Sequence, residues 1–221
     1  MRLSWGLVLV FAMVGAVEER ALAANAVRII DGDTIAVGGV HFRLFGIDAP
    51  EAGQPCATSA GGTWRCGDAA TEMLSSLVGA ELPACDERGM DAYDRMLSVC
   101  TVNGVELNAA MVSSGLAWAF RRYADDYGQQ EDQARTAGLG IWQATTETPW
   151  DYRDRRWSVA VQVAPDGCPI KGNISDGGHI YHTPWSPWYS KTKISLEKGE
   201  RWFCSERDAL DAGWRAPIWG H

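Results

Sequence analysis

Three short stretches near the start of the chain combine apolar and β-branched residues in the manner of β-strands. They cover residues 27–30, 34–37 and 40–47. The Gly38-Gly39 pair separates the second stretch from the third, and two glycines between strand-like runs are typical of a tight hairpin. Alternation along the third stretch directs one set of side chains toward the core: Val40, Phe42 and Leu44. Arg43 is therefore expected on the opposite face, away from the core.

Apolar residues recur at helical spacing in three later stretches, each of which stops close to a glycine. The stretches are residues 67–78, 106–114 and 127–136, and the glycines are Gly79, Gly115 and Gly138. Two further strand-like stretches cover residues 81–85 and 97–102. Roughly five strands and three helices in this order predict an α+β fold, a small barrel with packed helices.

The first 23 residues have the pattern of a secretory signal peptide. Arg2 precedes a mainly apolar run over residues 3–17, and Ala21-Leu22-Ala23 has the small-x-small pattern of a cleavage site. The alternative is an uncleaved membrane anchor, but the run is short for a membrane span. We therefore expect a secreted or periplasmic monomer with no stable membrane insertion after cleavage.

Charge divides the remaining chain into two parts. Residues 24–164 contain 11 arginines, no lysine and 19 acidic residues, and so carry the whole net charge of −8. Residues 165–221 contain four lysines and three arginines against seven acidic residues, and are neutral. We expect a main domain over residues 24–145, a connector or short helix over 146–166, and a small C-terminal module over 167–221. The acidic balance argues against a nonspecific nucleic-acid coat, but it does not exclude an enzyme that grips phosphate locally.

Six cysteines follow the predicted leader, and an even number in an exported chain indicates disulfides. Locality predicts the pairs Cys85–Cys100, Cys56–Cys66 and Cys168–Cys204. The first pair joins the ends of adjacent strand-like stretches, the second closes a loop, and the third staples the small module. For the module, zinc is the alternative, with the possible ligands Cys168, His179, His182 and Cys204.

Three polar groups accompany the strand-like stretches. They are Asp31-Gly-Asp-Thr34, then Arg43 with Asp48 and Glu51, and then Tyr93-Asp94-Arg95. Each group alone is weak, because Asp-Gly pairs are common in turns. Together they suit phosphodiester hydrolysis: hard carboxylate oxygens hold Ca²⁺, arginines grip a phosphate, and a carboxylate acts as a general base on water.

The sequence resembles the staphylococcal-nuclease-like, or thermonuclease, family. The matching stretches span residues 30–142 in family order: IDGDT, FRLFGIDAPE, WRCGDAA, YDRMLSVC, NGVELNAAMVSSGLAWAF and ARTAGLGIW. The resemblance implies an α+β fold, a five-stranded OB-fold β-barrel with three helices. It also implies a calcium-dependent nuclease that acts on DNA and RNA.

The resemblance implies a role for each matching residue. Asp33 and Asp48 would hold the calcium ion, together with the backbone carbonyl of Ala49, where the family usually has threonine. The residues that act on the phosphate and the water would be Arg43, Arg95 and Glu51. Asp31 would support these residues without itself binding the metal ion or the phosphate. Tyr93, and more weakly Tyr123, would stack on the nucleotide.

One position departs from the family pattern. The family usually has glycine before the second arginine, and here Asp94 precedes Arg95. Asp tolerates the left-handed conformation that such a turn needs, but it adds a negative charge beside an arginine that binds phosphate. We therefore expect weaker substrate binding than with glycine at this position.

The C-terminal residues resemble a small module, sometimes called a sunset domain, that is found on exported bacterial nuclease-like proteins. A segment of about 50 residues has little core and needs a staple. Trp185, Trp188 and Tyr189 lie among prolines and suggest two alternatives, a platform for bases or sugars or simply the core of a tiny domain.

The sequence therefore predicts an exported calcium-dependent endonuclease with nucleic acid as its substrate. The alternative is a non-catalytic OB-fold module that binds nucleic acid or an anionic polysaccharide, in the envelope or in succinoglycan-type exopolysaccharide assembly. Arg43, Glu51 and Arg95 favour the enzyme, because a pure binding module has no need of all three.

Overall fold

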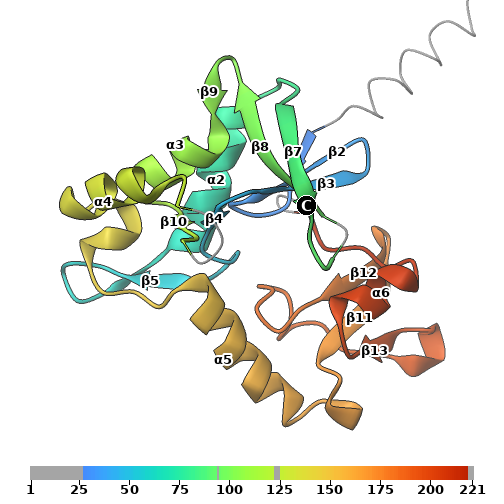
Figure 1. Ribbon diagram of the computed structural model, residues 1–221. Coiled ribbons are helices and arrows are strands. Elements are labelled where there is room, and N and C mark those ends of the chain that lie inside the picture. The colour runs from blue at the N-terminus through green and yellow to red at the C-terminus, as the bar shows by residue number, and fades with distance from the viewer. Residues whose placement is uncertain (1–26, 94, 122–124, 219–221) are drawn as a thin grey trace, which may run out of the picture.

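The computed structural model describes residues 27–93, 95–121 and 125–218 of the 221-residue chain. Figure 1 shows a body of sheet and helices, coloured blue to yellow, that a long helix joins to a small orange-to-red C-terminal module. The signal peptide predicted for residues 1–23 lies outside the described residues. Within the described ranges, no helix is long and apolar enough to cross a membrane.

The main sheet of the body contains a strand for each predicted region, but the strand predicted at 81–85 covers Ala84–Met90 instead. In spatial order they are β1 (Val27–Ile29), β2 (Thr34–Val37), β3 (Val40–Leu44), β8 (Met96–Val102) and β7 (Ala84–Met90), with β9 (Val105–Glu106) also paired to β8. β3 and β8 run parallel, and the other neighbours are antiparallel. A separate short pair joins β4 (Ile47–Asp48) to β10 (Trp118–Ala119). The predicted 40–47 strand is thus split into β3 and β4.

The hairpin predicted from the glycine pair is present. Val37 pairs with Val40, and Gly38 and Gly39 have φ values of 58° and 87°. A two-residue turn of this kind needs positive φ at both positions, which glycine adopts without strain. The predicted core face is only partly right: Leu44 is 1% exposed, but Val40 is 47% exposed. Val40 lies next to the turn, at the far end of the strand from Leu44.

The three predicted helices are confirmed as α2 (Cys66–Val78), α3 (Leu107–Ser113) and α4 (Gly128–Thr136). They cover the sheet, and the shared core includes Ile35, Leu44, Leu74, Leu107 and Met111. A short ribbon of β5 (Pro55–Ala57) and β6 (Thr63–Arg65) leads into α2, and a 3₁₀ turn, η1 (Gly140–Gln143), follows α4. The α+β prediction is therefore confirmed.

The predicted connector contains a 13-residue helix, α5 (Pro149–Val161). Thr148 caps this helix by accepting a hydrogen bond from the Asp151 N–H at 3.3 Å, and proline at the first helical position suits the start of a helix. The module then forms a sheet of β12 (Gly178–His182), β11 (Ile170–Ser175) and β13 (Arg201–Phe203), with the short helix α6 (Glu206–Asp211) and the 3₁₀ turns η2 (Pro165–Gly167) and η3 (Leu196–Lys198). Its core is small: Ile170, Tyr181, Phe203, Ala209 and Trp214.

All three predicted disulfides are confirmed. Cys56 pairs with Cys66, Cys85 with Cys100 and Cys168 with Cys204. The zinc alternative in the module is therefore wrong, because Cys168 and Cys204 are bonded to each other. His182 instead contacts Asn173 and Ser186, with its ring nitrogens 2.9 Å and 3.3 Å from their side-chain oxygens.

Candidate active site

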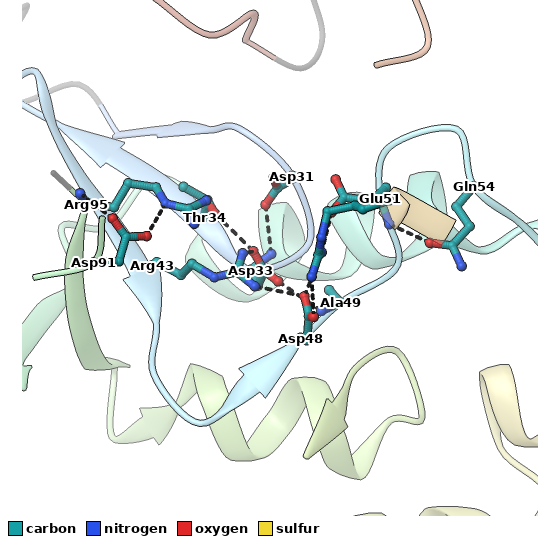
Figure 2. Close-up of polar contacts among 11 residues, drawn as sticks. Asp31, Asp33, Thr34, Arg43, Asp48, Ala49, Glu51, Gln54, Asp91 and Arg95 are labelled. Atoms are coloured by element: carbon teal, nitrogen blue, oxygen red, sulfur yellow. Dashed lines mark hydrogen bonds and ion pairs between the residues drawn. The ribbon is translucent and has the colours of Figure 1, made fainter. Parts of the chain in front are cut away.

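Two buried carboxylates and one arginine form the centre of the site. Asp33 immediately precedes β2, Asp48 ends β4, and Arg43 lies on β3 opposite Thr34. Arg43 pairs with Asp33 through Nη1, and its Nη2 lies 2.8 Å from Asp48 Oδ1. Figure 2 shows the side chains of these three residues converging between the strands that carry them. Arg43 was predicted to point away from the core. In the structure its guanidinium lies between Asp33 and Asp48, the two predicted metal ligands.

Burial sets the electrostatics of this centre. The side chains of Asp33 and Asp48 are only 3% and 1% exposed, and that of Arg43 is 15% exposed. Burial raises the pKa of Asp33, and the Arg43 charge opposes that rise without cancelling it. For Arg43, burial acts to lower the pKa, but the Asp33 and Asp48 charges outweigh it and raise the pKa. Removing Arg43 would leave the buried Asp33 without its compensating charge.

A hydrogen-bond network holds Asp33 in place. Its Oδ2 accepts a bond from the Ala49 N–H at 2.9 Å, and its Oδ1 accepts one from Thr34 Oγ1 at 3.0 Å. The Asp33 N–H in turn donates to Asp31 Oδ1 at 3.1 Å. Asp31 therefore contacts the centre through the backbone of Asp33, and its supporting role stays a prediction. The bond from Ala49 fixes the chain between Asp48 and Glu51 relative to β2.

Glu51 is held from its backbone side by Gln54. The Glu51 N–H donates to Gln54 Oε1 at 3.0 Å, and the fully buried Gln54 donates from Nε2 to the Glu147 carbonyl at 2.9 Å. Gly67, in the first turn of α2, packs against the Glu51 carbonyl so closely that any Cβ there would collide with it. Burial raises the pKa of Glu51 to about 7, against the lowering effect of the neighbouring Arg153.

Arg153 is a member of the site that the sequence analysis missed. It lies on α5, and its Nη2 is 2.8 Å from Asp48 Oδ2 while its Nη1 is 2.5 Å from Glu51 Oε1. Nη1 also lies 3.1 Å from Asp48 Oδ1. Burial acts to lower the pKa of Arg153, but the Glu51 and Asp48 charges outweigh it and raise the pKa. The Thr148-Pro149 start of α5 could have indicated the helix, but no local signal indicates contact with a carboxylate 105 residues earlier.

Arg95 lies at the other end of the group and has a different partner. Figure 2 shows Arg95 with Asp91 at one end and Glu51 with Gln54 at the other. Arg95 Nε is 2.7 Å from Asp91 Oδ2, while Asp91 Oδ1 accepts backbone N–H bonds from Tyr93 at 2.8 Å and Arg95 at 3.0 Å. Burial acts to raise the pKa of Asp91, but Arg95 and these bonds lower it overall. Asp91 was not predicted, although it lies only four residues before Arg95.

Two tyrosines were predicted to stack on the nucleotide, and the structure describes one of them, Tyr93. It is 39% exposed, and the Arg95 guanidinium carbon lies 5.4 Å from the centre of its ring. This position is compatible with the predicted role. Tyr123 and Asp94 lie outside the described residues, so their predicted roles stay predictions.

The site opens into a cleft of about 910 Å³. The body contributes Arg43, Asp48, Glu51 and Arg95 to its lining, and α5 and the C-terminal module also contribute to it. The predicted catalytic residues therefore share one cavity, although Arg95 pairs with Asp91 rather than with the central carboxylates.

The donor chemistry of the centre suits a hard cation. Asp33, Asp48 and the Ala49 carbonyl offer oxygen ligands, and the two buried carboxylates need compensating positive charge. Arginines supply that charge here, because Asp33 pairs with Arg43 and Asp48 with both Arg43 and Arg153. Within the described part of the chain, no group of three or more His, Cys, Asp or Glu side chains is arranged to hold a metal ion. The side-chain ligands of a bound cation would therefore be the two carboxylates of Asp33 and Asp48.

Two family models match the chain in separate places. Residues 41–144 match the family described as staphylococcal nuclease homologue, and residues 158–216 match the family described as ArfC. The resemblance of the tail to a sunset domain therefore stays a prediction.

Curated relatives match the nuclease part. A "Micrococcal nuclease" of Shigella flexneri is 33% identical over 147 residues, 58% of this chain and 79% of its own. An "Uncharacterized endonuclease" of Escherichia coli O157:H7 is 35% identical over 140 residues, 60% of this chain and 85% of its own. The "Succinoglycan biosynthesis protein ExoI" of Rhizobium meliloti (strain 1021) is 34% identical over 124 residues, which cover 54% of this chain and 64% of that protein. These matches identify the barrel as the expected OB-fold, and the chain belongs to the staphylococcal nuclease family.

Proposed function

We propose that this protein is an exported endonuclease that hydrolyses phosphodiester bonds of DNA and RNA and depends on Ca²⁺. The observation that carries the proposal is the convergence of Asp33, Arg43, Asp48 and Glu51 in one cleft that also contains Arg95. Nuclease names among the relatives support the reaction class.

In this proposal the arginines hold the scissile phosphate. The two ion pairs of Arg43 use two of its five N–H donors, so the same guanidinium can also donate to a phosphate oxygen. Arg95 lines the same cleft and is partly exposed. Planar guanidinium groups suit this task because they bind two oxygens at once and stabilise the charge that develops in the transition state.

Glu51 is the proposed general base. Its carboxylate accepts a proton from water as the water oxygen bonds to phosphorus, while the bond to the leaving oxygen breaks and that oxygen takes a proton from solvent. Gln54 holds the backbone of Glu51, Arg153 pairs with its carboxylate, and the residue lines the cleft. Bound at Asp33, Asp48 and the Ala49 carbonyl, Ca²⁺ would add positive charge beside the transition-state phosphate.

Export is part of the proposal. It rests on the leader pattern in residues 1–23 and is supported by the pairing of all six cysteines in disulfides, since such bonds persist in oxidising compartments. Expression of the full chain in a bacterial host, followed by mass analysis of the secreted and periplasmic fractions, tests this. The expected product begins at residue 24.

Incubation of the purified protein with plasmid DNA, with Ca²⁺ or with a chelator, tests the activity. We expect strand breaks with Ca²⁺ and none with chelator. Glu51→Gln is the matched control against a contaminating nuclease. Intact DNA at every Ca²⁺ concentration, with a folded protein, would contradict the proposal.

The second candidate is a non-catalytic module that binds an anionic polymer in exopolysaccharide assembly. The similarity to the relative named as a succinoglycan biosynthesis protein favours it, and so does Arg153, which pairs with both Asp48 and Glu51. Binding of acidic polysaccharide without DNA cleavage would support this candidate.

A further inference from the structure

The cleft that contains Glu51 has a second wall outside the nuclease fold. The body lines it with Arg43, Glu51 and Arg95, and α5 and the C-terminal module line it with Trp157, Trp185 and Trp188. Trp157 belongs to α5 and the other two belong to the C-terminal module. All three tryptophans are partly exposed, although Trp157 also packs against the core of the module.

Contacts on both sides of the cleft hold the module in this position. Next to Glu51, a Cβ built on Gly53 would lie only 3.1 Å from Pro187, so the loop after Glu51 packs against the turn between Trp185 and Trp188. At the opposite end, Arg207 Nη2 donates to the Ala92 carbonyl at 2.8 Å, in the turn between β7 and β8. The C-terminal module therefore contacts the body near both Glu51 and Arg95.

Helix α5 links the wall to the catalytic centre. Arg153, Arg156 and Trp157 are spaced i, i+3 and i+4, which places them on one face of the helix. Arg153 reaches Asp48 and Glu51, while Arg156 Nε donates to the Pro184 carbonyl at 2.8 Å. Trp157 lies next, with its ring centre 6.2 Å from that of Trp185 and the planes inclined at 39°. One helix face thus spans from the carboxylates to the aromatic wall.

The chemistry of the two walls is complementary to a nucleotide. Guanidinium groups on one side suit phosphate, and indole faces on the other suit the flat face of a base. The protein as a whole is acidic, so this local arrangement, rather than a broad basic surface, must provide the affinity.

We infer that Trp157, Trp185 and Trp188 form a base-stacking subsite, through which the C-terminal module binds the nucleotide next to the scissile phosphate. This inference rests on the proposed nuclease function. In a duplex the faces of each base are covered by its neighbours, so a single-stranded oligonucleotide is the appropriate probe.

The test measures the dissociation constant of a fluorescent oligothymidylate of eight nucleotides. The full protein carries Glu51→Gln, so that binding is measured without cleavage. We expect Trp185→Ala and Trp188→Ala each to weaken binding by roughly fivefold to 150-fold, the usual range for loss of one stacked base. Trp185→Phe and Trp188→Phe should retain most of the affinity. Trp202→Ala is the matched control, because Trp202 is in the same module but does not line the cleft.

An abasic strand of the same length separates stacking from a structural effect. The subsite predicts that the alanine variants and the parent bind this strand equally. Equal affinities of parent, Trp185→Ala and Trp188→Ala for oligothymidylate would overturn the inference, as would an equal loss on the abasic strand. Tighter, tryptophan-dependent binding of an acidic polysaccharide would overturn it in favour of a sugar subsite.

Plasmid cleavage by the protein without the Glu51 substitution keeps the two proposals apart. If plasmid is cleaved and the tryptophan variants bind normally, the subsite fails and the nuclease proposal stands. If oligothymidylate binds in a tryptophan-dependent manner and plasmid stays intact with Ca²⁺, the subsite stands and catalysis fails.

Discussion

The nuclease body and the C-terminal module reach a defined structure in different ways. The body packs a sheet and three helices around one core with many fully buried side chains. One disulfide joins β7 to β8, and another joins β5 to the start of α2. The module has five buried core residues, one disulfide and contacts with the body. This difference teaches that the body forms its own core, although its carboxylates Asp48 and Glu51 also pair with Arg153 of α5. The module depends on a disulfide and on docking to present its side chains.

The largest expected effect belongs to the body. Glu51→Gln should lower the rate of plasmid cleavage by about 10²–10⁴-fold if Glu51 is a general base. Gln54 holds residue 51 through the backbone N–H, so the variant should fold normally. Cleavage rates measured together with thermal unfolding check this. A rate within threefold of the parent would remove Glu51 from the mechanism.

Loss of the module disulfide should separate the two regions. Cys168→Ser with Cys204→Ser should destabilise the module by about 2–5 kcal/mol, because its small core offers little compensation. Hydrogen exchange resolved by peptide should show opening of residues 168–215 while the body stays protected. The corresponding serine pair at Cys85 and Cys100 is the control and should leave the module protected. Simultaneous opening of both regions would mean that they form one folding unit.

Acid should act on the module through His182. Burial, with a smaller contribution from Lys171, lowers the pKa of His182 to about 4. Since the folded-state pKa lies below the unfolded value, the neutral imidazole stabilises the fold above the unfolded pKa. That stability is lost as pH falls from about 6.5 to 4, by roughly 3 kcal/mol. Urea unfolding at several pH values, followed in the module, measures this.

His182→Gln provides the control for the acid effect. Gln can still form hydrogen bonds with Asn173 and Ser186 but does not titrate in this range. Its module should therefore show a flatter stability profile between pH 6.5 and 4. A profile as steep as that of the parent would assign the acid sensitivity to other groups.

Arg153 connects the two regions, and its removal should alter cation dependence. Arg153→Met removes a charge that pairs with both oxygens of Asp48, so the Ca²⁺ concentration for half-maximal cleavage should fall by up to about fivefold. Arg155→Met is the control, because the exposed Arg155 pairs with Glu147 and not with Asp48 or Glu51. An increase in the Ca²⁺ requirement would indicate that Arg153 helps to organise the metal ligands.

The smallest effect is expected at residue 94. Asp94→Gly removes a negative charge next to Arg95 in the sequence and should strengthen binding of a nucleotide inhibitor by about twofold to fivefold at low salt, the size of a weak charge interaction. Raising the salt concentration should reduce this difference, because salt screens charge interactions. Equal affinities of the two proteins at low salt would show that Asp94 does not weaken the phosphate site.

Most of the body could be predicted because its signals are local. The Gly38-Gly39 turn, the helix ends and the cysteine pairs each depend on residues close together in the sequence. The exposure of Val40 and the pairing of Arg95 with Asp91 were not predicted. The alternation of side chains predicts which face of a strand points toward the core, but not how far along the strand the core extends. The sequence also does not show which of several nearby carboxylates an arginine such as Arg95 will pair with.

The sequence by itself determined the α+β body, its strand order along the chain, the disulfide partners and the carboxylates Asp33, Asp48 and Glu51. Those residues were identifiable because each lies at the end of a recognisable strand and because the whole set matches one family. Only the tertiary structure decided that Arg153 contacts Asp48 and Glu51, and that Trp185 and Trp188 face the same cleft. These contacts join residues from separate elements, more than 100 positions apart for Arg153, and their proximity depends on how α5 and the module pack against the body.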